Sequence, residues 1–269
     1  MNLLFTINRN YIEHTLQCIE SILRYPSYDG YDFYILHSDL TEEEQGYLFG
    51  QLKSKQAVLH FQFVSADLFS SFPENKRYPR LIYYRILAAH LLPKHLDRVL
   101  YLDADTIVIN SLKELYYKEF GENAYLACSH VRKLLNKVNQ YRLGMEEKAM
   151  YINSGVLLMN LKYLRENQSI QAVAKYVADM KKRLLLPDQD IITALYSEKT
   201  GLLDAFLYNL SDRILTIYNS EPGHLKRDID WVRENTVIIH YCGKNKPWNK
   251  KYHGMLDVFY QELKTNSGC

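Results

Sequence analysis

The sequence predicts an α/β fold in which a mixed, mostly parallel central sheet is flanked by helices. Short apolar runs, each too short for a helix, alternate along the chain with segments of helical periodicity. One run, residues 99–102, is wholly apolar, as is typical of a central strand buried on both faces. No repeat and no change of composition divides the chain, so we expect a single domain over residues 1–269.

The first part of the chain opens as a strand–helix unit. Strands are expected at residues 2–7, 31–37, 58–64 and 99–102. Helices are expected at residues 11–24, 41–53 and 81–92. The helix from Thr41 has the capping-box residues Thr41 and Glu44, and Pro93 ends the last of the three.

The second part continues the alternation less regularly. Further strands are expected at residues 107–109, 125–129, 156–160 and 237–241. Helical segments are expected at residues 112–115, 168–184 and 187–196, the last with Pro187 at its start. Residues 132–148 are polar and weakly periodic, which predicts a loop or a mobile helix near the site. Residues 251–269 are expected to form a tail, disordered from Thr265 onward.

Charge and composition exclude several classes of protein. The net charge is only +2, from 33 basic and 31 acidic residues, which argues against a dedicated nucleic-acid binder. No apolar run approaches the roughly 20 residues of a membrane span, and the start lacks the features of a signal peptide. The four cysteines are scattered without zinc spacing, as free thiols in a reducing compartment would be. We expect a cytoplasmic protein, with peripheral attachment to the inner face of the membrane as a further option.

Two carboxylates follow the central apolar run directly. Asp103 and Asp105 are two residues apart, so on an extended backbone both point to one side, at the carboxyl edge of the sheet where ligands bind. Two such charges 4 Å apart repel by about 4 kcal/mol at an effective dielectric of 20. A divalent cation would compensate them; a solvated acidic turn is the competing interpretation.

The break after the first strand offers a second group of polar side chains. Asn8 and Asn10 lie where a dinucleotide-binding fold would carry glycines, so a Rossmann dinucleotide site is disfavoured. Their amides suit contacts to a base or ribose. They are equally suited to cap the following helix, and the sequence leaves both interpretations open.

Five motifs lie in order along this α/β frame. They are Tyr84-Arg85, Asp103-Ala104-Asp105, Asn153-Ser154-Gly155, Pro187-Asp188-Gln189-Asp190 and His240-Tyr241-Cys242-Gly243-x-x-Lys246-Pro247-Trp248. As an ordered set they resemble the retaining glycosyltransferases of family 8, the group of glycogenin and the bacterial lipopolysaccharide galactosyl- and glucosyltransferases. The resemblance covers residues 2–248.

The resemblance implies a GT-A fold, a UDP-hexose donor (UDP-glucose or UDP-galactose) and a glycan or glycolipid acceptor. It implies Mn²⁺, or Mg²⁺, bound by Asp103, Asp105 and His240; carboxylate oxygens suit both ions, and the imidazole favours Mn²⁺. About residues 1–110 would then hold the nucleotide, and about residues 111–250 the donor sugar and the acceptor. Oligomeric state is not implied.

The remaining site residues follow from the same resemblance. The donor and nucleotide would be bound by Thr6, Asn8, Asn10, Arg85, Asp103, Ala104, Asp105, Asn153, Asp188, Gln189, His240, Gly243 and Lys246. Asp188 and Gln189 are the expected catalytic residues, with Lys246 on the diphosphate. Gln189 is a poor nucleophile, so both double displacement and front-face attack stay open. The competing interpretations are helix-terminus compensation for Asp188, a solvated helix face for Arg85 and a core histidine for His240.

Two departures from the family pattern are visible. Many relatives have an acidic residue where this chain has Cys128-Ser129-His130, so a sugar or acceptor contact is expected to differ. Some bacterial relatives also have a long basic and aromatic C-terminal segment for membrane attachment, whereas here a short stretch follows Trp248.

Two other functions compete with glycosyl transfer. A haloacid-dehalogenase-like phosphohydrolase also uses D-x-D with Mg²⁺, but near the N-terminus and with a threonine one position later than Thr106. A non-catalytic sugar-nucleotide-binding protein is the second alternative. It would not be expected to retain all three metal ligands and Lys246, and turnover would exclude it.

Overall fold

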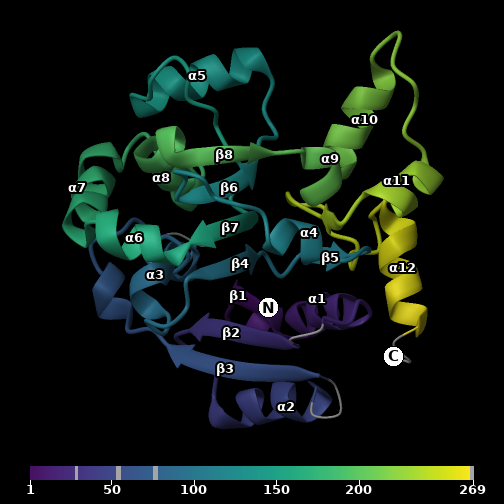
Figure 1. The fold of residues 1–269 in the computed structure, drawn as a ribbon, viewed down its shortest axis with the longest axis horizontal. Coiled ribbons are helices and arrows are strands. Elements are labelled where there is room, and N and C mark those ends of the chain that lie inside the picture. Colours follow the sequence, from purple (N-terminus) through teal and green to yellow (C-terminus); the bar gives the residue numbers. More distant parts are fainter. Residues whose placement is uncertain (28–29, 53–55, 75–77, 267–269) are drawn as a thin grey trace.

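A computed structural model describes residues 1–27, 30–52, 56–74 and 78–266. Within these residues, a seven-stranded sheet of order β3-β2-β1-β4-β7-β6-β8 forms the centre, with helices on both of its faces (Figure 1). Its strands are β1 (Asn2–Thr6), β2 (Tyr31–His37), β3 (Ala57–Phe63), β4 (Arg98–Leu102), β6 (Tyr125–Cys128), β7 (Val156–Asn160) and β8 (Thr200–Leu203). β7 runs antiparallel to both neighbours, β4 and β6, while the other pairings are parallel. The predicted mixed, mostly parallel sheet is confirmed.

A smaller sheet lies beside the carboxyl end of β4. It pairs β5 (Thr106–Val108) with β9 (Ile238–His240) in antiparallel register, with Thr106 opposite His240. The strand expected at residues 107–109 therefore exists, but it leaves the central sheet directly after the two aspartates. This pairing brings the end of the chain to the end of the central strand.

The helices surround the sheet and also extend beyond it. They are α1 (Ile12–Leu23), α2 (Glu42–Leu52), α3 (Ala88–Leu91), α4 (Lys113–Tyr116), α5 (Lys133–Leu143), α6 (Leu161–Asn167), α7 (Ile170–Met180), α8 (Pro187–Tyr196), α9 (Ala205–Tyr208), α10 (Asp212–Ser220), α11 (Ile229–Asn235) and α12 (Asp257–Asn266), with 3-10 turns η1 (Arg9–Tyr11), η2 (Ala66–Phe69), η3 (Arg80–Tyr83) and η4 (Ser197–Lys199). The capping box is confirmed: Thr41 N donates to Glu44 Oε2 (2.8 Å) and Glu44 N to Thr41 Oγ1 (3.2 Å). The helix end expected at residue 53 lies outside the described residues.

Alternate residues of β4 pack into two different cores, which explains its continuous apolar run. Leu100 and Leu102 belong to the cluster beneath α1, whereas Val99 and Tyr101 belong to the cluster on the other face. All four side chains are at most 1% exposed. The interpretation of residues 99–102 as a strand buried on both faces is confirmed.

One helix prediction is wrong. Residues 81–92 do not form a single α-helix; they form the 3-10 turn η3, further turns and the short helix α3. Tyr83, Tyr84 and Arg85 are consecutive and all buried, so no single stripe faces the core. Packing on every side, with i→i+3 bonds such as Ile86 N to Tyr83 O (3.0 Å), replaces the regular helix.

Three other segments differ from expectation in detail. Residues 132–148 contain a true helix, α5, and residues 168–184 contain the shorter α7. The disorder expected from Thr265 is wrong for Thr265 and Asn266, which are the last residues of α12. α12 is held by Phe259, Tyr260 and Leu263, which pack in a third apolar cluster with Ile239 of β9. Residues 267–269 lie outside the described residues.

Candidate metal and donor site

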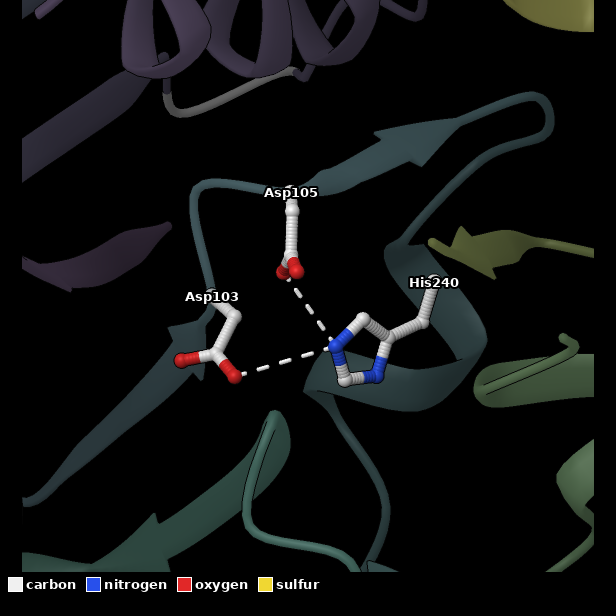
Figure 2. A group of neighbouring side chains, drawn as sticks. All are labelled: Asp103, Asp105 and His240. Atoms are coloured by element: carbon white, nitrogen blue, oxygen red, sulfur yellow. Dashed lines mark ion pairs between the residues drawn. The ribbon is translucent and has the colours of Figure 1, made fainter. Parts of the chain in front are cut away.

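The two aspartates and His240 converge at the carboxyl end of β4. The β5–β9 pairing sets Thr106 opposite His240, and so places the imidazole beside Asp105. His240 Nε2 lies 3.2 Å from Asp105 Oδ1 and 3.7 Å from Asp103 Oδ2. Figure 2 shows the three side chains pointing toward one another, the two aspartates from the connection between β4 and β5 and His240 from β9. One ligand atom from each lies within 4.8 Å of the others, as metal binding requires.

A chain of hydrogen bonds fixes the orientation of the His240 ring. Gly155 N donates to Asn153 Oδ1 (3.0 Å), and Asn209 Nδ2 donates to the same oxygen (3.0 Å). Asn209 Oδ1 is therefore the acceptor for His240 Nδ1, at 2.9 Å. With the proton on Nδ1, the lone pair of Nε2 faces the two carboxylates, the arrangement typical of a metal-ligating histidine.

Asp105 has more acceptor oxygens than nearby hydrogen-bond donors. Asp105 Oδ1 is buried and has no hydrogen-bond partner, as expected of an oxygen that is oriented toward a cation. Lys246 Nζ forms an ion pair with Asp105 Oδ2 and donates to Tyr241 O (2.9 Å). Burial opposes ionisation of Asp105, but the neighbouring His240 and Lys246 outweigh it and hold the pKa of this carboxyl below its usual range. The donor set fits a divalent cation.

Gly155 allows the cluster to close. A Cβ at this position would lie 2.1 Å from His240 Cε1 and 2.9 Å from Asp103 Oδ2, too close for any side chain. The turn that precedes β7 can approach the imidazole and Asp103 only because residue 155 is glycine. The sequence pointed to Asn153-Ser154-Gly155 as a motif, but the role of its glycine is visible only in the structure.

Arg85 joins the metal cluster to α8. Its side chain is only 7% exposed, so the alternative of a solvated helix face is wrong. Nη1 lies 2.8 Å from Asp103 Oδ1 and 3.3 Å from Asp188 Oδ2, and donates to Ser154 O (3.2 Å). The guanidinium also stacks over the Tyr101 ring, 4.3 Å from its centroid. The sequence did not single out Tyr101, whose hydroxyl donates to Asp103 Oδ1 (2.5 Å).

Asp188 and Gln189, in the first turn of α8, face this cluster. Asp188 Oδ2 accepts from Ser154 Oγ (2.9 Å), and Gln189 Oε1 accepts from Asn153 Nδ2 and Ser154 N (both 3.3 Å). Both residues are 8% exposed. Burial raises the pKa of the Asp188 carboxyl above its ordinary value, although Arg85 acts against this. The structure thus brings together Arg85, Asp103, Asn153, Asp188 and Gln189.

The predicted residues near the first strand lie in less connected positions. The Thr6 hydroxyl is 3.3 Å from that of Tyr101. Asn8 Oδ1 accepts from Asn10 N (3.1 Å) and caps η1, so the capping interpretation holds for Asn8, while Asn10 is exposed. Ala104 packs beside the α1 core, and the exposed Gly243 has φ of +101°, a backbone conformation that favours glycine.

Asn209 is the site residue that sequence reasoning missed most completely. It is fully buried and connects His240 to Asn153. It follows α9 and lies in no recognisable motif, so no local pattern marks it. His14 and Trp248, whose rings stack at 3.6 Å, were likewise not connected by the sequence.

Comparison with solved structures defines the fold. The galactosyltransferase LgtC, solved in complex with donor and acceptor sugar analogues, superposes with a TM-score of 0.83 at 24% identity, covering 99% of this chain and 96% of that one. An active-site mutant of LgtC gives a TM-score of 0.85 at 24% identity, with the same coverage. The fold is therefore the GT-A fold of glycosyltransferases.

Sequence comparison defines the family. The model for glycosyl transferase family 8 matches residues 2–252, and the chain belongs to that family. The lipopolysaccharide 1,2-glucosyltransferase of Escherichia coli is 29% identical over 252 residues, which are 92% of this chain and 73% of the relative. The lipopolysaccharide 1,3-galactosyltransferase of Salmonella typhimurium is 23% identical, covering 99% and 78%. The resemblance inferred from the motifs is confirmed, and the phosphohydrolase alternative is not favoured.

The structure also bears on the membrane question. Among the helices of the described residues, none combines the length and the apolar character that a bilayer span demands.

Proposed function

We propose that this glycosyltransferase moves a hexose, glucose or galactose, from a UDP-sugar to a hydroxyl of a glycan or glycolipid acceptor, with retention of configuration and with a divalent metal. The observation that supports it most directly is the convergence of Asp103, Asp105 and His240 around a buried oxygen without a hydrogen-bond partner. The relatives named lipopolysaccharide glucosyl- and galactosyltransferases support the choice of sugar and acceptor.

In this proposal the metal site stabilises the departing nucleotide. Asp103, Asp105 and His240 would hold Mn²⁺ or Mg²⁺, which when bound supplies Lewis-acid stabilisation of the leaving UDP. Asn209 holds the His240 ring in the tautomer that ligation needs. Lys246, which pairs with Asp105 here, provides a second positive charge at the same place for a diphosphate.

The Arg85 cluster would bind the donor sugar. Burial raises the pKa of Asp188, and its carboxylate contacts only Ser154 Oγ and Arg85 among the neighbouring side chains, which leaves acceptor capacity for sugar hydroxyls. Gln189 uses its oxygen on Asn153 Nδ2 and Ser154 N, and its amide group also bonds the Tyr151 hydroxyl, which leaves one amide hydrogen for the sugar. Arg85 positions Asp188 and Asp103 relative to each other. Within one catalytic unit, residues 1–110 would thus bind the nucleotide, through Thr6, Asn8, Asn10 and Ala104 as well, and residues 111–250 the sugar and acceptor.

Calorimetric titration of UDP with and without Mn²⁺ tests the metal and the donor together. We expect Mn²⁺-dependent UDP binding that chelator abolishes, and slow Mn²⁺-dependent hydrolysis of UDP-glucose or UDP-galactose without acceptor. His240→Ala should lose the Mn²⁺-dependent binding, whereas His60→Ala, at a half-buried histidine on β3 that pairs with Asp32, should not. UDP binding that is equal in excess EDTA would contradict the metal site, and tighter binding of GDP than UDP would contradict the donor. Binding without any turnover would favour the non-catalytic alternative.

A further inference from the structure

Helix α5 has its polar side toward the protein and its apolar side toward solvent. Its buried residues include Asn136 and Gln140, whose amides donate to Ala149 O at 2.9 and 2.8 Å. The opposite face exposes Leu134 (75%), Leu135 (45%), Val138 (55%) and Tyr141 (91%). These four lie at spacings of one, four and seven residues, which form one stripe on a helix. Buried polar residues with an exposed apolar stripe are the reverse of an ordinary surface helix.

The stripe continues onto the loop that leads into α8. Leu185 and Leu186 are 63% and 36% exposed. This loop is fixed to α5, because Arg142 donates to Arg183 O (2.7 Å) and also binds Asp190 of α8. We name the six apolar side chains together the α5 patch: Leu134, Leu135, Val138, Tyr141, Leu185 and Leu186. In Figure 1 α5 stands at the outer side of the molecule, beyond β8 and away from the central strands.

The charges on the two segments that carry the α5 patch, residues 131–143 and 181–186, are of one sign. Residues 131–143 and 181–186 contain no aspartate or glutamate. Their basic residues are Arg132, Lys133, Lys137, Arg142, Lys181, Lys182 and Arg183. Arg132 pairs with Glu221 and Arg142 with Asp190, while Lys133, Lys137, Lys181, Lys182 and Arg183 are exposed. The exposed acids next to these segments are Asp179 (which pairs with Lys175), Glu146 and Glu147 in the turn after α5, and Glu221, the partner of Arg132.

We propose that the α5 patch docks on the surface of a lipid bilayer that contains anionic lipids. Apolar side chains flanked by lysine and arginine are what interfacial helices use, since the apolar groups enter the acyl boundary and the cations meet anionic headgroups. A second copy of this chain fits poorly, because two such faces would bring like charges together. The site of the proposed reaction lies close by: Leu186 is two residues before Asp188. Docking through α5 would therefore hold the first turn of α8 near the bilayer, where a glycolipid acceptor is presented.

Flotation of the whole protein with lipid vesicles tests the proposal. Vesicles of phosphatidylcholine alone are compared with vesicles that also contain about one third phosphatidylglycerol. We expect binding to the anionic vesicles that weakens as salt is raised, and much less binding to phosphatidylcholine. Lys133→Gln with Lys137→Gln should weaken vesicle binding about 30-fold at low salt, because each cation contributes a factor of about five. Leu134→Ser with Tyr141→Ser should weaken it on the order of 100-fold.

Matched controls separate docking from general stickiness. Lys94→Gln with Lys162→Gln removes two exposed cations elsewhere, and Phe49→Ser with Val58→Ser removes two exposed apolar residues on α2 and β3. Both should bind vesicles as the parent does. The single variant Tyr141→Ser, at a side chain 91% exposed, guards against a fold defect in the double variant. UDP binding is measured on every variant and should not change, so failure of docking is distinguishable from failure of the proposed function.

Three results would overturn the proposal. The first is absence of binding to anionic vesicles at low salt, and the second is equal losses in the patch variants and their controls. The third is that the parent sediments as a dimer, whereas the patch variants sediment as monomers and bind vesicles as the parent does. That result would assign the α5 patch to self-association.

Discussion

Two aspartates in the first turn of α8, two residues apart, lie in opposite electrostatic environments. Asp190 is fully buried, and donors surround it. It accepts hydrogen bonds from Arg142 Nη1 and Nη2 (both 2.8 Å), Tyr151 Oη (2.5 Å), Leu185 N (2.6 Å) and Leu186 N (3.1 Å). Asp188, by contrast, accepts a hydrogen bond from Ser154 Oγ (2.9 Å) and lies 3.3 Å from Arg85 Nη1. Asp190 therefore anchors the protein, while Asp188 retains hydrogen-bonding capacity for a substrate.

The same contrast distinguishes the two clusters of buried charge around them. We call the cluster of Arg142, Tyr151 and Asp190 closed because both carboxylate oxygens of Asp190 accept hydrogen bonds, although Arg142 Nε has no partner. The cluster of Arg85, Asp103, Asp105 and His240 leaves Arg85 Nε and Asp105 Oδ1 without partners. Incomplete compensation is costly for stability, which is why it marks a binding site and not a structural one. The backbone amides ahead of α8, Leu185 N and Leu186 N, bond to Asp190, so Asp190 compensates most of this helix terminus.

The largest effect is expected at the closed cluster. Asp190→Asn should lower the free energy of unfolding by about 3–5 kcal/mol, because it leaves the buried guanidinium of Arg142 without its carboxylate. Urea denaturation measures the change. The double variant Arg142→Met with Asp190→Leu should recover much of the loss, as both charges are then removed. If Asp190→Asn lowers the free energy of unfolding by less than about 1 kcal/mol, Asp190 is not the structural anchor that distinguishes it from Asp188.

Asp188→Asn should instead lower turnover by on the order of 100-fold, since contacts to sugar hydroxyls strengthen in an oxocarbenium-like transition state. Its UDP affinity should be nearly that of the parent, and its stability should be equal or greater. Steady-state kinetics measure the loss of turnover, and UDP titration measures the affinity. Equal losses of turnover and UDP affinity would indicate that Asp188 contacts the metal or the diphosphate and not the sugar.

Asn209→Leu tests the hydrogen bond that orients His240. We expect Mn²⁺ affinity to fall about 10–100-fold, because the ring loses the acceptor that fixes its tautomer. Asn209→Asp keeps an acceptor at that position and should restore most of the affinity. An Mn²⁺ affinity lower in Asn209→Asp than in Asn209→Leu would contradict the positioning role. If Asn209→Leu does not fold, Asn209→Asp is compared with the parent alone.

The smallest effect is a difference in pH dependence. Because burial raises the folded-state pKa of Asp188, the folded protein binds this proton more tightly than the unfolded chain. The contribution of Asp188 to stability is thus present below the ordinary aspartate pKa near 4 and is lost as pH rises through the folded-state value. The stability of Asp188→Asn relative to the parent should therefore increase with pH above 4 and then level off. Thermal melts across this range measure it; a relative stability that decreases with pH would mean that Asp188 is fully compensated.

Local patterns predicted most of the strands and the motif residues well. β2 was predicted to the residue. The carboxylates of Asp103 and Asp105 converge as predicted, but on a turn closed by Thr106 N to Asp103 O (3.1 Å) and not on the extended backbone that the prediction assumed. The helix predicted over residues 81–92 was wrong, because consecutive buried residues carry no periodic stripe from which a helix can be distinguished from tight turns. The inverted orientation of α5 was equally hidden, since periodicity shows where an apolar face lies but not whether the protein covers it.

The sequence by itself determined the alternation of strands and helices, the family motifs and the types of ligand at the site. It did so because a strand, a helix or a D-x-D turn depends on neighbours within a few residues. Only the tertiary structure decided that β5 pairs with β9 and so brings His240 to Asp105, that Asn209 orients His240, and that Asp190 is satisfied where Asp188 is not. Each of these depends on contacts between residues far apart in the chain, and packing, not local pattern, selects them.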